Sequence, residues 1–191
     1  MINYKFLFFL LFIFLFSNFN NAKEILIYAD SINYDEQENI IARGNAKVYK
    51  DNQLIISDLI IYKKKEKKIL LPIDFTLKDN NNNYLSGSSG FFNENLDSGE
   101  FLDVKIKLHD GSRLIGNKGK REKHIDIITK GVYSPCKSRI KIGNFICPTW
   151  QLEAEKILHD SKNLFLYQKH SKMRIINTPA FYIPYIVTPS P

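Results

Sequence analysis

Cysteine and histidine are scarce in this chain, and their spacing excludes several kinds of site. The 191 residues include two cysteines and four histidines, and neither cysteine has a second Cys or His at the short spacing that a zinc site needs. No local group of residues offers a nucleophile or a matched acid and base. We therefore expect no metal site, no cofactor and no catalytic residues, and the alternative of an exported hydrolase has no motif behind it.

Signatures of phosphate loops and of nucleic-acid binding are also missing. The glycine-containing stretch at 87–90 lacks the lysine that follows in a phosphate loop. The net charge of +7 is scattered among strand-like segments and does not follow one helix, which in an exported protein favours lipids or phosphate-bearing surfaces over nucleic acid. The densest run, Lys63–Lys68, is typical of a solvated hairpin loop, with a contact to lipid head groups as the alternative.

No apolar run reaches the length of a membrane-spanning helix, which needs about 20 residues. The run Phe6–Phe16 follows Lys5 and precedes the more polar stretch Ser17–Ala22. This layout is typical of a cleaved signal peptide rather than of a retained anchor. We therefore predict a signal peptide at 1–22, export, and one mature domain with its own core.

Both cysteines, Cys136 and Cys147, lie in the exported part of the chain, where disulfides persist. The simplest prediction is a bond between them, and the alternative is a bond from one of them to a cysteine elsewhere. A loop of this length would add about 3 kcal/mol to stability if the geometry is unstrained.

One five-residue pattern occurs three times with identical spacing. In each copy the first two residues share a strand face and so do the last two, but a step of three separates the pairs. Both pairs face one interior only if an extra residue is inserted at the acid, as in a β-bulge, which bends the strand. We therefore predict a curved, folded-over sheet of antiparallel strands. The copies are Ile27, Ala29, Asp30, Ile32, Tyr34, then Ile55, Ser57, Asp58, Ile60, Tyr62, then Leu152, Ala154, Glu155, Ile157, His159.

Strand-like segments recur roughly every 8 to 12 residues, with turn residues between them. This spacing predicts an all-β domain. Trp150–Leu158 contains a helix-favouring stretch, but we assign it as a strand because it carries the third copy of the pattern. Val132–Pro148 is predicted as a loop or excursion. The predicted strands are 24–35, 39–49, 53–63, 68–77, 84–92, 100–109, 112–119, 124–131, 150–159 and 163–176.

The segment 178–191 is rich in proline and aromatic residues, so it must be an edge strand or a connector. Inside the sheet, apolar residues alternate with polar ones, most clearly along Ile40–Val48, where Arg43 and Lys47 should point outward. Alternation leaves two possibilities for the interior: a closed core, or an open trough that holds a long lipid.

Two motifs carry a resemblance to a known family. The run from Ala29–Asp35 through Ala42–Ala46 to Ser57, Asp58 and Tyr62 resembles the OstA-like domain of periplasmic lipopolysaccharide-transport proteins. Ser134–Cys136, Trp150–Asp160 and Pro179–Tyr185 look like the N-terminal domain of the LptD family of outer-membrane lipopolysaccharide-assembly proteins. Thr178 and Ser190 depart from the family, which often has Gly and Asp there.

The resemblance implies a half-open β-jelly roll over 23–177 whose apolar inside carries the acyl chains of lipopolysaccharide, and a connector at 178–191 toward an outer-membrane barrel. The chain stops after the connector, so we interpret it as a truncated or split form. In the family the cysteine at the position of Cys136 bonds to the barrel, and without a barrel Cys147 is the available partner. The implied groove residues are Ile32, Tyr34, Ile40, Ala42, Ala46, Val48, Ile60, Tyr62 and Ile157.

The expected partners follow from the same resemblance. They are lipopolysaccharide, a periplasmic bridge protein of the same fold, and, if a full-length protein exists, the barrel and its lipoprotein plug, in the periplasm next to the outer membrane. Docking to the bridge would use an unpaired edge strand, whose residues include Ile25, Ile27, Tyr28 and Ser31. The alternatives are a purely structural docking module and a free periplasmic bridge protein of the LptA type.

Overall fold

The computed structural model describes residues 24–135, 139–142, 145–176 and 178–190, with only the backbone for 139–142 and 145–148. Fourteen strands of these residues form one antiparallel sheet, and a separate hairpin completes the set. The strands are β1 (Leu26–Tyr28), β2 (Ser31–Tyr34), β3 (Ile40–Lys50), β4 (Gln53–Lys63), β5 (Lys68–Leu71), β6 (Phe75–Lys78), β7 (Tyr84–Gly87), β8 (Ser89–Asn93), β9 (Ser98–Lys107), β10 (Arg113–Glu122), β11 (Ile125–Ser134), β12 (Arg139–Ile142), β13 (Phe145–Pro148), β14 (Trp150–Asp160), β15 (Phe165–Ile175) and β16 (Thr178–Pro189).

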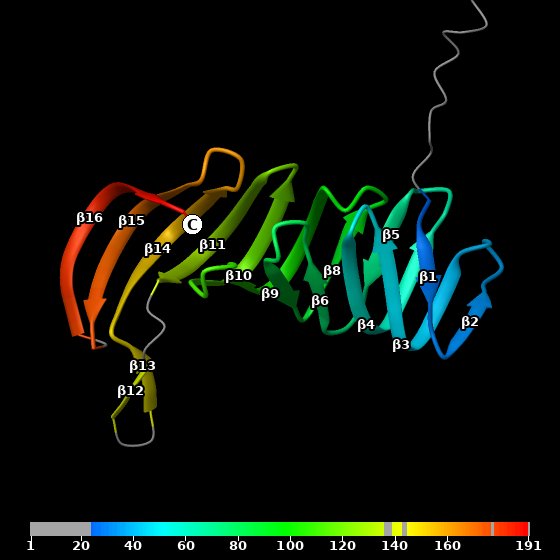
Figure 1. The fold of residues 1–191 in the computed structure, drawn as a ribbon, viewed down its shortest axis with the longest axis horizontal. Helices are drawn as coiled ribbons and strands as arrows, with labels where there is room; N and C mark the ends of the chain where they lie inside the picture. Colours follow the sequence, from blue (N-terminus) through cyan, green and yellow to red (C-terminus); the bar gives the residue numbers. More distant parts are fainter. Residues whose placement is uncertain (1–23, 136–138, 143–144, 177, 191) are drawn as a thin grey trace, which may run out of the picture.

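The sheet is a long twisted roll with β1 and β2 at one end and β16 at the other (Figure 1). In the part of the chain that the structure describes, no helix is long and apolar enough to cross a membrane. The all-β, antiparallel class predicted from the sequence is confirmed, including the strand assignment of β14 against its local helix propensity.

The roll has two layers that share the long strands. β4 pairs with β6 through Leu54–Ser57 and with β5 through Ile61–Lys63, and β9 divides in the same way between β7 and β8. We call the layer with β1, β6 and β7 the first layer and the one with β2, β5 and β8 the second. The predicted strands 68–77 and 84–92 are therefore each split. Pro72, between β5 and β6, has no N–H to donate, which suits a break at this point.

A crease runs across the sheet where each long strand passes from one layer to the other. At the crease two successive residues are exposed, as at Thr129 and Lys130, and the residues on both sides of the pair face inward. The parity break predicted from the repeat is thus confirmed: Ser57 and Ile60 are both buried on β4, and Ala154 and Ile157 on β14. The residues of the crease are Asn45, Asp58, Asp103, Asn117, Lys130, Glu155 and His170.

The bend is made differently from the prediction. On alternate long strands one crease residue has a positive φ, as at Asp103, Lys130 and His170. The register shift between β3 and β4 falls at Arg43–Ala46, so the extra residue lies on β3, opposite Asp58, and not on the strand that carries the acid. Left-handed residues turn the chain sharply, so the strands bend together and most neighbours keep their register.

Gly44 is a closely packed point of this bend. Its φ is +75°, and an added Cβ would lie 2.5 Å from Oδ2 of Asp30. The amide of Asp30 also donates to the carbonyl of Gly44 at 2.9 Å, and the Asn45 side-chain amide donates to Oδ2 of Asp30 at 2.9 Å. Asp30, the acid of the first repeat, therefore links the end of β1 to the crease residues of β3 by two hydrogen bonds.

We expect Gly44→Ala to lower the free energy of unfolding by about 1–2 kcal/mol for the left-handed backbone alone, with a further cost from the clash with Asp30. Urea denaturation measures the loss. In the double variant with Asp30→Ala the clash disappears, so part of the cost of Gly44→Ala should be recovered. Equal stability of Gly44→Ala and the parent protein would contradict the strained bend.

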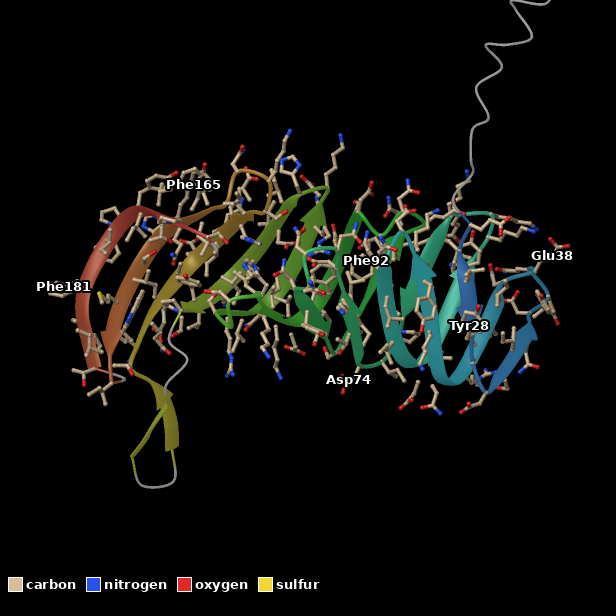
Figure 2. All side chains as sticks on the ribbon, viewed as in Figure 1. Tyr28, Glu38, Asp74, Phe92, Phe165 and Phe181 are labelled. Atoms are coloured by element: carbon tan, nitrogen blue, oxygen red, sulfur yellow. The ribbon has the colours of Figure 1, made fainter. Side chains whose placement is uncertain are left out.

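Aromatic side chains fill the middle of the roll. Phe92 lies 5.9 Å from Phe75 and 5.3 Å from Phe101, measured between ring centroids, and all three are buried. Figure 2 shows Phe92 near the middle of the length of the roll, while Tyr28 and Phe181 lie toward opposite ends. The interior between β3 and β11 is therefore a closed, well-packed core in this state.

The remaining predictions concern the less regular parts of the chain. Within the predicted excursion, residues 139–142 and 145–148 pair as strands β12 and β13 apart from the roll. Of the two alternatives for 178–191, the structure has an edge strand, β16, and the role of a connector stays a prediction. The signal peptide at 1–22 and Cys136 lie outside the described residues, and only the backbone of Cys147 is described, so the disulfide also stays a prediction.

Candidate functional site

The predicted groove residues all belong to the inner wall of the roll. Five are almost completely buried, namely Ala42, Ala46, Val48, Ile60 and Ile157. Ile40 and Tyr62 are half-buried, and Ile32 and Tyr34 are exposed. The structure thus brings the set together along one surface that is closed in the middle of the roll and open toward β2.

The open end is formed by β2. Ile32 pairs with Ala42 and Tyr34 with Ile40, so both side chains lie on the inward face. They are nevertheless 43% and 72% exposed. We call this end the N-terminal mouth, where the apolar inner wall continues into solvent.

The edge of each layer that lies away from the crease is called its rim. Tyr62 lies at the rim of the second layer, near the N-terminal mouth. Its hydroxyl donates a hydrogen bond of 2.8 Å to Oε1 of Glu94. Burial, followed by this hydrogen bond, raises the pKa of Tyr62 to about 12, so the phenol stays neutral and polar contact is confined to its tip. Its ring packs against the core.

A buried ion pair closes the rim of the second layer farther along the roll. Nε of Arg121 donates to Oδ1 of Asp126 at 2.7 Å, and Nη2 donates to Oδ2 at 3.0 Å. Burial alone would raise the pKa of Asp126, but the charge and hydrogen bonds of Arg121 outweigh it and hold that pKa well below its ordinary value. The side chains of His159 and Ser190 lie beside this pair, and together the four residues form what we call the rim cluster: Arg121, Asp126, His159 and Ser190.

In the rim cluster, Ser190, His159 and Asp126 are arranged in the spatial order Ser–His–Asp that a serine hydrolase triad has, but their environment does not suit a nucleophile. Nε2 of His159 lies 3.0 Å from Oγ of Ser190, and Nδ1 lies 3.5 Å from Oδ2 of Asp126. However, Arg121 holds both oxygens of Asp126, Ser190 is buried, and the amide of Ser190 donates to the carbonyl of Leu164 rather than to an oxyanion site. The arrangement closes the rim. Its members lie far apart in the sequence, so no local motif could have indicated them.

The two rims approach each other beside this cluster. A hollow of about 510 Å³ is lined by Asn81 and Asn83 of the first layer and by His159 and Lys162 of the second. Among the described residues, no group of three or more His, Cys, Asp or Glu side chains could hold a metal ion.

The predicted edge strand forms one end of the described sheet. Within the described residues, β1 and β2 pair only with β3. Tyr28 is exposed and lies edge-on to Tyr49 at 5.8 Å between centroids, Ser31 is exposed opposite Arg43, and Ile27 packs inward against the core. Ile25 precedes β1 and also contacts the core. The outer backbone of β1 and β2 is thus exposed at the end of the roll.

A second hollow, of about 830 Å³, lies on the outer face of the second layer. Its floor is apolar and its wall carries lysines, and the Lys68 ammonium lies 3.6 Å from the ring centroid of Phe91 beside it. No local sequence pattern indicates this hollow, because its residues come from strands far apart in the chain. They include Leu70, Phe91, Leu102, Ile127, Lys118 and Lys156.

The fold has similar structures among known proteins, although neither family models nor curated proteins match the chain. The chain is similar to the crystal structure of LptH from Pseudomonas aeruginosa, described as the LptA homologous periplasmic component of the conserved lipopolysaccharide transport device. The identity is 14%, the match covers 88% of this chain and 96% of that chain, and the TM-score is 0.29.

Proposed function

We propose that this chain takes part in lipopolysaccharide transport in the periplasm, where its inner wall shelters the acyl chains of the lipid. The observation that carries the proposal is the N-terminal mouth: Ile32 and Tyr34 extend the buried apolar wall into solvent. The OstA-like motifs of the sequence, Ala29–Asp35 and Ala42–Ala46, build this same end of the roll.

The energetic task is the transfer of a hydrocarbon chain through water. Each exposed methylene costs about 0.8 kcal/mol, so a chain of a dozen carbons needs roughly 10 kcal/mol of shelter. The inner wall supplies this shelter by burial, without chemistry. Because Phe75, Phe92 and Phe101 fill the middle, passage requires the two layers to part at their rims, with the crease as the hinge. The driving energy comes from other components of the pathway.

We further propose that the chain is the docking end of the transport bridge, of the LptD type, and that β1 and β2 receive the edge strand of a bridge protein. The Trp150–Asp160 and Pro179–Tyr185 motifs support this assignment. A bridge protein of the LptA type has the same inner wall and edges, so it is the main alternative. A docking module without lipid is the second, and it differs in predicting an empty inner wall.

A photoreactive side chain at Ile32 should crosslink to lipopolysaccharide in the periplasm. The matched control is the same probe at Asn33, which is exposed on the same strand but faces outward opposite Ile41. Equal crosslinking at both positions would mean contact through the outer surface and would overturn the groove. No crosslink at either position would favour the docking module.

The same probe deeper in the wall separates an opening roll from a closed core. Ala46 is completely buried, while Lys47 on the other face is partly exposed. If the layers part during transport, the probe at Ala46 also crosslinks to lipid. A permanently closed core would instead be overpacked, which costs about 1–3 kcal/mol of stability and gives no adduct.

A further inference from the structure

The inner wall becomes polar toward β16. On β15 the inward positions beside the crease are Gln168 and Ser171, both 0% exposed. The amide nitrogen and oxygen of Gln168, Oγ of Ser171 and Oγ1 of Thr188 are buried without a hydrogen-bond partner among the described residues. The inward positions of β3 and β4 are mainly apolar by comparison, as at Val48, Ile55 and Ile60.

These polar groups lie on the inward face of two neighbouring strands, on both sides of the crease. Gln168 pairs with Ile157 on one side and with Ile186 on the other, and Thr188 follows two residues after Ile186 on the same face. Ser171 lies across the crease from Gln168 and pairs with Ile183. The group therefore sits on β15 and β16, surrounded by aliphatic side chains.

Gln168 and Ser171 lie on β15, and only β16 separates them from the end of the roll. Ile183 and Ile186 of β16 are only half-buried and Phe181 is exposed, although the register places them on the inward face opposite Ser171, Gln168 and Met173. This forms a C-terminal mouth. A ligand that entered here would meet Gln168 and Ser171 after passing a single strand.

Buried polar groups without partners cost free energy, so their presence needs an explanation. By contrast, the buried hydroxyl of Ser57 on β4 has a hydrogen-bond partner, because it donates to the carbonyl of Asp74 at 2.8 Å. A carboxamide and two hydroxyls can donate and accept hydrogen bonds but carry no charge. They suit an uncharged hydroxyl or amide group, and the aliphatic surroundings suit a hydrocarbon chain.

We propose that Gln168, with Ser171 and Thr188 on either side of it along the sheet, makes a polar stretch of the inner wall that binds a hydroxyl or amide group on an acyl chain inside the roll. The proposal rests on the proposed function, because it specifies which acyl chains the inner wall prefers. The inner wall should therefore bind acyl chains with different affinities. Chains that carry a hydroxyl near one end should bind more tightly, with the hydroxyl at β15.

The test is competition by two soluble probes against a fluorescent fatty acid bound to the full chain. The probes are tetradecanoic acid and the same acid with a hydroxyl on its third carbon. We expect the parent protein to bind the hydroxylated acid about tenfold more tightly, as expected for one or two hydrogen bonds in an apolar site. Gln168→Leu and Ser171→Ala should lose this preference but keep binding tetradecanoic acid.

Two controls make the result decisive. Ser57→Ala removes an inward hydroxyl that already has a partner, so it should leave the preference unchanged. Gln168→Leu should also raise the melting temperature of the ligand-free protein, and a lower melting temperature would show that bound water satisfies the amide and would overturn the proposal. Binding of both acids without a preference would overturn the polar site alone. Binding of neither acid would overturn the proposed function with it.

Discussion

Replacing Arg121 by Met is expected to lower the free energy of unfolding by about 3–5 kcal/mol, because it leaves the carboxylate of Asp126 buried without its counter-charge. Arg121 and Asp126 have side chains that are 9% and 7% exposed, and they are joined by two hydrogen bonds. Chemical denaturation at neutral pH measures the loss. The matched control is Lys120→Met on the same strand, whose ion pair with Glu122 is exposed, so its removal should change stability little.

The double variant Arg121→Met, Asp126→Leu should recover most of the stability, since it replaces the ion pair with apolar groups and leaves no buried charge. A double variant as unstable as Arg121→Met would show that Arg121 acts through packing instead of charge. That outcome would contradict the role assigned to the ion pair.

The pH dependence of the same pair has a defined sign. The pKa of Asp126 is lowered in the folded chain, so its contribution to stability is present above the ordinary carboxyl pKa of about 4 and is lost as the pH falls through the folded value. The stability difference between the parent protein and Arg121→Met should therefore be largest near neutral pH and narrow below about pH 4. A constant difference across this range would contradict the assignment.

Proline in place of Tyr28 is expected to weaken binding to a bridge protein by at least about thirtyfold. Docking by strand addition depends on backbone hydrogen bonds of about 1 kcal/mol each along an unbent edge, and proline at this position removes a donor on the β3 side and so loosens β1. Ser31→Pro on β2 should act in the same way. The isolated roll should stay folded in both variants, since most of the buried core lies between β3 and β15. Binding is measured with the immobilised bridge protein, and folding by thermal denaturation.

The control for this edge is Tyr28→Val, which removes the exposed ring but keeps the backbone donor. We expect binding to remain within a few-fold of that of the parent protein. Unchanged binding in both proline variants would exclude strand addition at this edge. A loss as large in Tyr28→Val as in Tyr28→Pro would mean that the partner recognises the pair formed by Tyr28 and Tyr49 rather than the backbone.

The bend of the sheet was predictable because it leaves a periodic trace in the apolar residues. Ser57 and Ile60, three apart and both buried, could share an interior only across a break in strand parity. The means of bending was not predictable. Lys130 adopts a positive φ although lysine has no special preference for it and a glycine follows directly, so the cooperative bending of adjacent strands selects this position.

The polar parts of the interior could not be located from local sequence. Gln168 and Ser171 look like ordinary polar positions of an alternating strand, and their burial depends on the crease, which shifts the inward face by one residue between them. Arg121 and His159 meet Asp126 because β10, β11 and β14 are neighbours in the sheet. The proline-rich segment at 178–189 forms a strand because the pairing with β15 is available and nothing within the described residues needs its outer donors.

The three prolines of β16 make the two ends of the roll unequal. Pro179, Pro184 and Pro189 cannot donate to β15, so the positions without an N–H face the outside of the sheet. A strand arriving at this edge would find about every fifth residue unable to bond, whereas β1 and β2 contain no proline. The prolines of β16 therefore act against edge-to-edge association at this end of the roll, as edge-strand prolines do in other β proteins.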